Sequence, residues 1–238
     1  MKIDQPKTGY RFSIDPFILT AHIKPEYYNT IIDIGCGCCI MPLILINKYP
    51  DLNLKIIGVE IQKELFFYAK KNILANGLKK QIQIIHKDIK DIMIGKEIKQ
   101  KADIIISNPP YAKKSSSRLN LNTQKAIAKH EITLDIDSFF NCTNRLLNTK
   151  GKVYIIFPAK RLSEIIIVMA EYKFYPLFIR FVHIKKNMDA KWSIICAIKN
   201  KSESCLVKSP LYIYQSKNKF TKEYKTIFNK NTLNYQQT

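Results

Sequence analysis

Five short apolar segments constrain the fold of this chain of 238 residues more than any other feature. Each is continuously apolar instead of alternating, which is typical of strands covered on both faces of a sheet. They lie at residues 30–36, 55–60, 82–88, 102–108 and 152–158. Helical patterns separate them at residues 41–48, 63–75, 138–147 and 162–172. This alternation predicts an α/β fold with a doubly wound, mostly parallel sheet that carries helices on both faces.

The pattern changes after residue 172. Residues 176–184 and 192–199 have strand character and are joined by a polar connection, so we expect a C-terminal antiparallel hairpin at the sheet edge. The residues from 217 onward are polar and basic, and we expect them at the periphery. The chain thus divides into an N-terminal segment (1–28), a main domain (29–215) and a basic C-terminal tail (216–238).

The balance of charge favours a polyanionic partner. Lysine and arginine total 39 against 19 acids, a formal net charge of +20, and nucleic acid is the first candidate for such a surface. The chain is also rich in lysine, isoleucine and asparagine together, so AT-biased coding is an alternative source of part of the charge. Charge alone therefore indicates a nucleic-acid partner without specifying which one.

Neither a membrane span nor a metal site is expected. The longest apolar runs are far shorter than a bilayer span, and residues 1–8 lack the apolar region of a secretion signal, so we expect a cytoplasmic protein. The six cysteines have no CxxC spacing, and no histidine lies near the cluster at 36–39. They are expected to be reduced, buried thiols.

Small residues follow the first predicted strand, in a turn that contains Asp33, Gly35 and Gly37. Glycines let the backbone turn tightly and approach a ligand closely, although such turns also serve packing alone. Glu60 ends the second strand, where a carboxylate can accept both hydrogen bonds of a ribose diol. Together they predict a nucleoside site. A dinucleotide is the alternative ligand, but the turn lacks the third glycine at G-x-G-x-x-G spacing, and S-adenosylmethionine needs no such phosphate-binding turn.

Asp88 ends the third predicted strand. An acid there can accept a hydrogen bond from the adenine amino group of such a cofactor, and capping of a following helix is the alternative role. Ile61 and Ile89, which follow Glu60 and Asp88, complete the cofactor-binding residues predicted beside these two strands.

The fourth predicted strand runs into Asn108, Pro109, Pro110 and Tyr111, which we predict to be catalytic. Successive prolines fix the backbone and remove two donors, so the Pro109 carbonyl and the Asn108 side-chain oxygen present two acceptors at one point. A ring-conjugated amino group is a poor nucleophile because its lone pair is delocalised. Accepting both of its N–H hydrogens frees that pair for in-line attack on a sulfonium methyl, with positioning and fixed dipoles lowering the barrier.

Two further features belong to this motif. Tyr111 offers a face on which a flipped base stacks, worth roughly 1–3 kcal/mol. Asn108 lies next to both ligands and is therefore also counted as cofactor-binding. A purely structural Pro-Pro turn is the alternative, and the apolar strand and the nucleoside site upstream argue against it.

These residues resemble the class I methyltransferases of the NPPY group, which act on amino or amide nitrogens. A closer resemblance, to the bacterial tRNA1(Val) adenine-37 N6-methyltransferases, extends through almost the whole chain. It is carried by residues 5–15 (QPKTGYRFSID), 118–119 (RL), 126–131 (AIAKHE), 161–165 (RLSEI) and 211–214 (LYIY). The resemblance implies a Rossmann-like class I fold of seven strands, whose sixth and seventh form the hairpin.

The resemblance also implies further site residues. Residues 5–15 are expected to close over the cofactor, which makes 1–28 a cofactor-capping segment with Phe12 and Ser13 as cofactor-binding residues, and 29–215 the methyltransferase domain. Residues of this segment and of the basic loop at 112–134 are expected to bind the substrate. The substrate-binding set is Arg11, Tyr111, Lys113, Lys114, Arg118 and His130. For His130 and Glu131, helix capping or loop anchoring is as good a role as base recognition.

The chain departs from the family pattern at two positions. The family's first turn usually runs D-x-G-x-G-x-G, and its last glycine is Cys39 here, a small side chain that implies weaker cofactor binding. Lys129 stands where the family often has arginine, which leaves open a substrate other than tRNA1(Val).

The sequence therefore predicts a monomeric S-adenosylmethionine-dependent methyltransferase that acts on the exocyclic N6 of an adenine in tRNA, with adenine 37 of tRNA1(Val) as the expected target. The enzyme alternatives are N5-glutamine methylation of a protein and amino methylation of rRNA or DNA. No separate substrate-recognition domain is visible, which disfavours a large sequence-specific DNA enzyme. The non-enzyme alternative is an RNA-binding module with a decayed cofactor pocket, for which Cys39 is the only sign.

Overall fold

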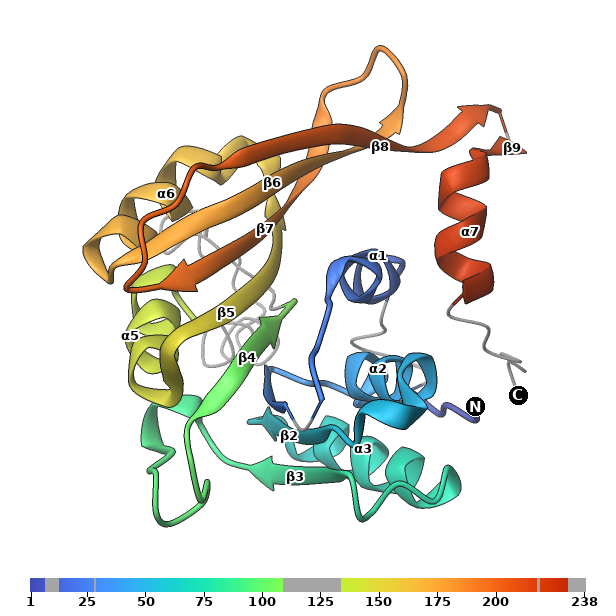
Figure 1. The fold of residues 1–238 in the computed structure, drawn as a ribbon. Helices are drawn as coiled ribbons and strands as arrows, with labels where there is room; N and C mark the ends of the chain where they lie inside the picture. The colour runs from blue at the N-terminus through green and yellow to red at the C-terminus, as the bar shows by residue number, and fades with distance from the viewer. Residues whose placement is uncertain (7–12, 28, 109–133, 218, 231–238) are drawn as a thin grey trace, which may run out of the picture.

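A computed structural model describes residues 1–6, 13–27, 29–108, 134–217 and 219–230. Within these residues a single sheet of nine strands is covered by helices on both faces (Figure 1). The strands are β1 (Thr30–Ile34), β2 (Lys55–Glu60), β3 (Ile82–His86), β4 (Ala102–Ser107), β5 (Leu147–Pro158), β6 (Phe174–Lys185), β7 (Ala190–Lys199), β8 (Leu206–Ser216) and β9 (Lys219–Phe220). Their order across the sheet is β3-β2-β1-β4-β5-β7-β6-β8-β9.

Strands β1 to β5 run parallel to one another, and β7 is antiparallel to both β5 and β6. The predicted parallel strands and the predicted hairpin, which is β6 and β7, are confirmed. The hairpin does not form the sheet edge, because β8 pairs in parallel with β6, and β9 pairs with β8. The expected seven-stranded class I arrangement is therefore extended by β8 and β9, which the sequence analysis did not predict.

The helices form two layers around two hydrophobic clusters. On one face lie α1 (Asp15–His22), α2 (Ile40–Lys48), α3 (Lys63–Ala75) and α7 (Lys222–Lys230). On the other lie α5 (Ile136–Leu146) and α6 (Leu162–Glu171). The connections contain the 3-10 helices η1 (Pro50–Leu52), η2 (Ile89–Asp91) and η3 (Ala159–Arg161).

Both faces of the central strands are covered, which explains their uninterrupted apolar sequences. Ile104 and Ile106 of β4 face the cluster on the α1 side, whereas Ile105 between them faces the cluster on the α5 side. All three side chains are buried. Burial of one such side chain contributes about 1.5–3 kcal/mol, so a polar residue on either face of these strands would be destabilising.

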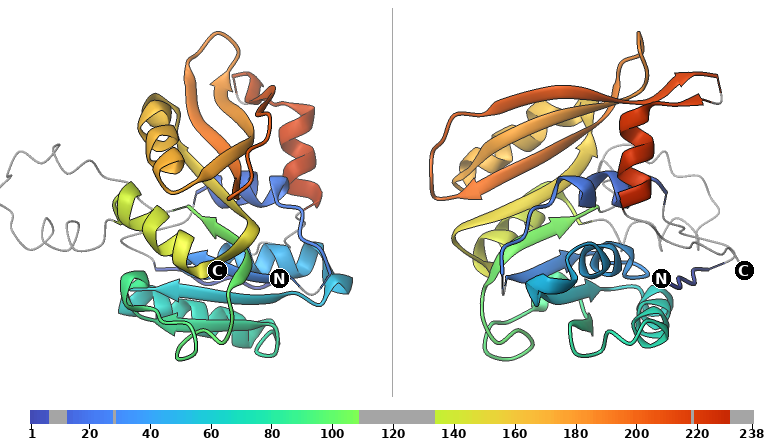
Figure 2. Two further views of the ribbon diagram at one scale, coloured as in Figure 1. Left: turned by 60° about the vertical axis from the view of Figure 1, so that its left-hand side comes forward. Right: turned by 45° about the vertical axis from the view of Figure 1, so that its right-hand side comes forward.

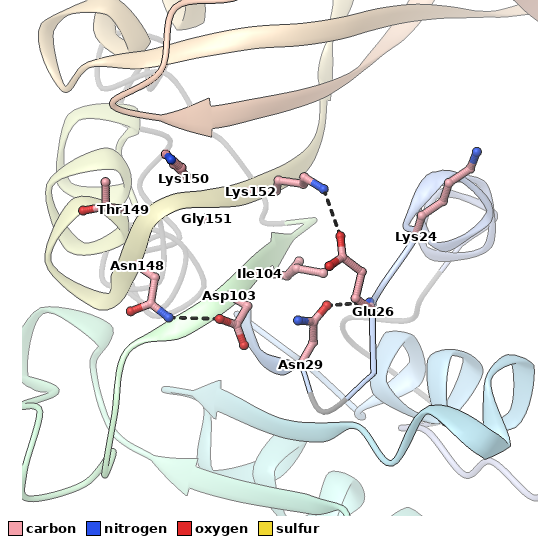
Figure 3. A pocket seen from close by; sticks show the side chains of 10 residues that line it. All are labelled: Lys24, Glu26, Asn29, Asp103, Ile104, Asn148, Thr149, Lys150, Gly151 and Lys152. Atoms are coloured by element: carbon pink, nitrogen blue, oxygen red, sulfur yellow. Dashed lines mark hydrogen bonds and ion pairs between the residues drawn. The ribbon is translucent and has the colours of Figure 1, made fainter.

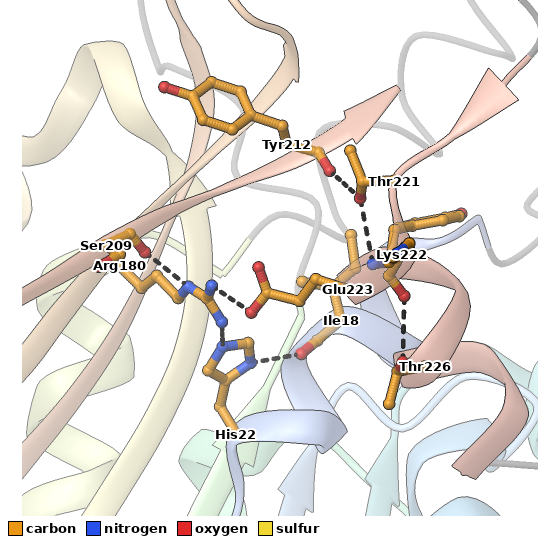
Figure 4. Close-up of polar contacts among 10 residues, drawn as sticks. Ile18, His22, Arg180, Ser209, Tyr212, Thr221, Lys222, Glu223 and Thr226 are labelled. Carbon is orange, nitrogen blue, oxygen red and sulfur yellow. Dashed lines mark hydrogen bonds and ion pairs between the residues drawn. The ribbon is translucent and has the colours of Figure 1, made fainter. Parts of the chain in front are cut away.

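The C-terminal helix α7 packs against α1 and β6. Phe228 stacks on Phe17 of α1 with ring centroids 4.8 Å apart. Arg180 of β6 donates hydrogen bonds to both His22 of α1 and Glu223 of α7 (Figure 4). The prediction of a peripheral tail is therefore wrong for residues 222–230, which lie against the core.

Candidate active site

The carboxyl ends of β1 and β4 lie side by side where the order of the parallel strands reverses. From β1 the chain proceeds to β2 and β3 on one side, and then to β4 and β5 on the other. Ligands of open α/β sheets bind in the crevice at such a point. A hollow lies there, lined by Pro16, Gly35, Cys36, Gly37, Cys38, Ile40, Met41 and Asn108. The structure thus brings Asn108 against the turn that contains Gly35 and Gly37.

The turn after β1 has three residues in the left-handed backbone region. Gly35 has a φ of 71°, Gly37 of 55° and Cys39 of 70°. Glycine adopts this conformation without a steric penalty, whereas a residue with a Cβ is strained by about 1–2 kcal/mol. The amides of Gly35 and Cys36 both donate to the carbonyl of Val59, at 2.9 and 3.1 Å, which holds the turn against β2. Cys39 therefore carries strain that the family's glycine would avoid.

Glu60, at the end of β2, holds the same turn. Its Oε2 accepts from the amide of Gly37 at 2.8 Å, and its Oε1 accepts from the amide of Gln62 at 2.8 Å. The side chain is almost fully buried, and burial raises the pKa of its carboxyl, opposed by the hydrogen bonds from the amides of Gln62 and Gly37. The acid that was expected to face a ribose therefore also organises the glycine turn.

Asp33, just before the turn, is a buried carboxyl without a hydrogen-bond partner among the described residues. Its side chain is 0% exposed, and neither Oδ1 nor Oδ2 has a partner there. Burial, followed by the nearby charge of Glu60, raises the pKa of this carboxyl well above its usual range. Polar groups buried without partners are rare in native proteins, so we expect a partner for this carboxyl outside the described residues, either a bound ligand or another part of the chain.

Asn72 of α3 joins the turn to the N-terminal segment. Its Nδ2 donates to the carbonyl of Cys38 at 3.0 Å and to the carbonyl of Asp4 at 2.8 Å, and its Oδ1 accepts from the amide of Asp4 at 2.7 Å. The sequence analysis missed this residue. Its signal was an amide on the apolar face of α3, where Leu65 and Ala69 are buried.

The other predicted cofactor residues lie at the same edge of the sheet. Asp88 caps η2: its Oδ1 accepts from the amide of Lys90 at 2.9 Å, so the alternative capping role is present. Ile61 is 40% exposed beside the end of β2, Ile89 is buried, and Ser13 is exposed just before α1. The remaining predicted residues lie outside the described part of the chain. They are Arg11, Phe12, Pro109, Pro110, Tyr111, Lys113, Lys114, Arg118 and His130.

A second hollow, of about 170 Å³, lies at the opposite, amino-terminal edge of the sheet (Figure 3). Four of its polar side chains bind one another: Lys152 pairs with Glu26 at 3.6 Å, and Asn148 donates to Asp103 at 3.0 Å. Cofactors of parallel sheets bind at the carboxyl edge, and this hollow has no glycine turn at a strand end. We therefore assign the site to the smaller hollow beside Asn108.

The thiols around the turn are not arranged for metal or nucleophilic chemistry. Burial raises the pKa of Cys36 and of Cys39 well above the usual range, and raises that of Cys38 to about 12, so all three stay protonated at neutral pH. In the described part of the chain, His, Cys, Asp and Glu side chains do not gather into a group of three or more that would hold a metal ion. No helix of that part is both long and apolar enough to cross a membrane.

The strand order, the glycine turn after β1 and the asparagine after β4 define a class I methyltransferase fold, and comparison with known proteins agrees. A family model described as the methyltransferase small domain matches residues 16–169. Among solved structures, the protein Atu636 from Agrobacterium tumefaciens, described as a predicted O-methyltransferase, superposes with a TM-score of 0.71 and 16% identity. That match covers 91% of this chain and 96% of the other and shows the likeness of fold.

Two similar curated proteins carry the name tRNA1(Val) (adenine(37)-N6)-methyltransferase. The protein from Histophilus somni (strain 129Pt) is 24% identical over 238 residues, covering 98% of this chain and 94% of that protein. The protein from Porphyromonas gingivalis is 30% identical over 176 residues, covering 72% and 68%. The chain belongs to the methyltransferase small domain family and is a methyltransferase. The family implies S-adenosylmethionine as the methyl donor.

Proposed function

We propose that this chain transfers the methyl group of S-adenosylmethionine to the exocyclic N6 of an adenine in tRNA, with adenine 37 of tRNA1(Val) as the target. The observation that carries the proposal is the hollow in which Asn108 meets Gly35 and Gly37. In this hollow the side-chain oxygen of Asn108, a hydrogen-bond acceptor, lies beside the glycine turn after β1, at the point where the strand order reverses. The names of the relatives supply the nucleic acid and the atom that is methylated.

The chain's own residues fit the cofactor. Gly35 and Gly37 let the backbone approach it closely, and Asp33, whose carboxyl has no partner among the described residues, lies two positions before Gly35. Glu60 holds the turn by accepting from the amides of Gly37 and Gln62 with different oxygens, and Ile61 adds a third backbone hydrogen bond. A carboxylate has about four lone-pair sites, so it can still accept from a ribose hydroxyl. When bound, S-adenosylmethionine supplies a methyl group activated by the adjacent sulfonium.

Asn108 orients the acceptor. Its side-chain oxygen accepts an N–H hydrogen of the adenine amino group, which turns the nitrogen lone pair away from the ring. Ser107 secures this position, because its Oγ donates to the carbonyl of Ile34 at 2.7 Å and so ties the end of β4 to the end of β1. A buried base is unnecessary, since an N-protonated aromatic amine releases its proton readily to water.

The proposal retains the roles predicted for residues outside the described part of the chain. The carbonyl of Pro109, followed by Pro110, supplies the second acceptor, and Tyr111 stacks on the flipped base. Phe12 and, from the described residues, Ser13 close over the cofactor. The substrate residues are Arg11, Lys113, Lys114, Arg118 and His130.

The experiment is tritiated methyl transfer to an unmodified tRNA1(Val) transcript by Asn108→Ala. Loss of one positioned dipole lowers kcat by about 10²–10³-fold. Calorimetry measures the affinity of the variant for S-adenosylmethionine. Unchanged affinity shows that the variant has lost the positioning of the adenine and not the binding of the cofactor. The matched control is Asn148→Ala, which removes an asparagine from the amino-terminal edge and is expected to keep full activity. Full activity of Asn108→Ala would end the mechanism, and loss of N6-methyladenosine from the tRNA of a deletion strain identifies the acceptor in the cell.

A further inference from the structure

The hairpin of β6 and β7 extends beyond the sheet at the edge where the candidate site lies. β7 is antiparallel to both β5 and β6, so β6 runs in the same direction as β4 and β5, and β8 runs parallel to β6. The turn after β6 and the end of β8 therefore lie at the carboxyl edge, and Figures 1 and 2 show both projecting from the rest of the sheet. We refer to residues 183–192 and 212–216 as the arm.

The base of the arm adjoins the candidate site. Trp192 pairs with Pro158, the last residue of β5. The charge of Lys191 acts on Asp15, the first residue of α1: burial raises the pKa of the Asp15 carboxyl, and a hydrogen bond from Ser13 and the charge of Lys191 oppose that rise. Asp15 in turn precedes Pro16, which lines the hollow beside Asn108. The arm thus begins at the site and leads away from it.

Lysines and aromatic rings lie near one another on the arm. Lys185, Lys186 and Lys191 are exposed, and Asp189 is the one acid among residues 185–191. The Nζ of Lys191 lies 4.3 Å from the centroid of the Trp192 ring. The ring centroids of His183 and Tyr212 are 5.2 Å apart. Lys185 is paired with Tyr214 in the register of β6 and β8, so a lysine again lies next to an aromatic residue. Basic groups that track phosphates beside rings that contact bases are typical of surfaces for nucleic-acid strands.

We propose that the arm binds the RNA strand that flanks the target adenine, with Lys185 and Lys186 on its phosphates. This inference rests on the proposed function, because it assumes that the acceptor is RNA. Coding bias scatters lysines over the whole surface and does not explain their place among aromatic rings at the carboxyl edge. RNA fits this surface better than an acidic protein, because rings beside the lysines add stacking to charge.

The test compares two lysine pairs. Lys185→Ala/Lys186→Ala changes the arm, and Lys79→Ala/Lys80→Ala removes the same charge from the exposed α3–β3 connection at the opposite edge. In the arm variant, the loss of two phosphate contacts should raise the Kd for the tRNA1(Val) transcript roughly ten- to thirty-fold at about 0.15 M salt. The decrease of log K with log salt should become less steep, its slope shrinking in magnitude by about 1.4–1.8. The affinity for S-adenosylmethionine and kcat at saturating tRNA stay unchanged, since neither lysine touches the reacting atoms.

Each outcome decides one of the proposals. Weakening in the arm variant but not in its control supports the arm. Equal Kd values for tRNA in the wild type and the arm variant overturn the arm proposal, and so does equal weakening in the arm variant and its control. If the arm variant loses tRNA affinity but an acidic polypeptide competes with tRNA for the wild-type arm, the proposal that RNA is the occupant is also overturned. A wild-type chain that neither binds nor methylates the transcript overturns the proposed function and the arm together.

Discussion

The imidazole of His22 in α1 accepts one hydrogen bond and donates another, which holds it in its neutral form (Figure 4). Arg180 Nη1 lies 3.0 Å from its Nε2 and can only donate, so Nε2 accepts and the proton is on Nδ1, which donates to the carbonyl of Ile18 at 2.7 Å. Burial, with the Arg180 charge adding to it, lowers the pKa of His22 from its ordinary value of 6.5 to about 4. Protonation would place a second N–H against the guanidinium.

The direction and size of the effect on stability follow from this pKa. The unfolded chain binds the proton first on acidification, so the stabilisation is complete above about pH 6.5 and is lost as pH falls toward about 4. The full loss amounts to roughly 3 kcal/mol, and the part between about pH 7 and about pH 5 to about 2 kcal/mol. Buried carboxyls with raised pKa values, such as Asp33, act in the opposite direction, so only a difference between variants isolates His22.

The assay is urea unfolding of wild type and His22→Gln at both pH values. We expect the wild type to lose about 2 kcal/mol more than the variant on going from about pH 7 to about pH 5. His183→Gln, which removes an imidazole from the arm, is the matched control and should keep the wild-type loss because His22 is intact. Parallel losses in wild type and His22→Gln would refute the assigned protonation state and the geometry behind it.

Two further predictions concern the turn after β1. Cys39→Gly should lower the free energy of unfolding by at least about 2 kcal/mol less than Cys142→Gly does. Both thiols are buried, but glycine relieves the left-handed strain at position 39, whereas it weakens helix α5 at position 142. Urea titration measures both variants, and equal losses of stability would contradict the strain at Cys39. Asp33→Asn should be more stable than wild type at about pH 8 and lose that advantage toward about pH 4, because a raised carboxyl pKa removes stability as pH rises; titrations at the two pH values test this, and a constant difference would contradict it.

The fold could be predicted wherever both faces of a strand are covered. The runs in β2 and β4 are uninterrupted because alternate residues enter opposite clusters, and β2 and α3 have the predicted bounds. β8 escaped prediction because it pairs near the edge, where Leu206 and Val207 are 60% and 63% exposed, and because the polar and proline residues 208–210 interrupt its apolar sequence. For α7 the signal was weaker: Tyr224 and Phe228 of the helix, with Phe220 of β9 before them, place an aromatic residue at every fourth position.

The site could be predicted where strand direction alone places residues together. Parallel strands end at one edge, so the turn with Gly35 and Asn108 had to be neighbours once β1 and β4 were recognised as adjacent. Asn72 could not be found this way, because its partners Asp4 and Cys38 come from distant segments that only tertiary packing brings to α3. The direction of the Glu60 side chain was equally inaccessible, since it depends on where the amide of Gly37 points.

The site and the C-terminal helix are mechanically connected through α1. Pro16 of α1 forms one wall of the hollow, while Phe17, the next residue, stacks on Phe228 of α7. Arg180 links the other end of α1 to α7 and to the carbonyl of Ser209, so β6, β8 and α7 all bear on one helix of two turns. A helix this short is not stable alone, because its nucleation cost exceeds the gain from so few hydrogen bonds. The wall of the cofactor hollow that α1 forms is therefore held in place by contacts with residues far along the chain. Arg180, for example, contacts His22 across a separation of 158 residues.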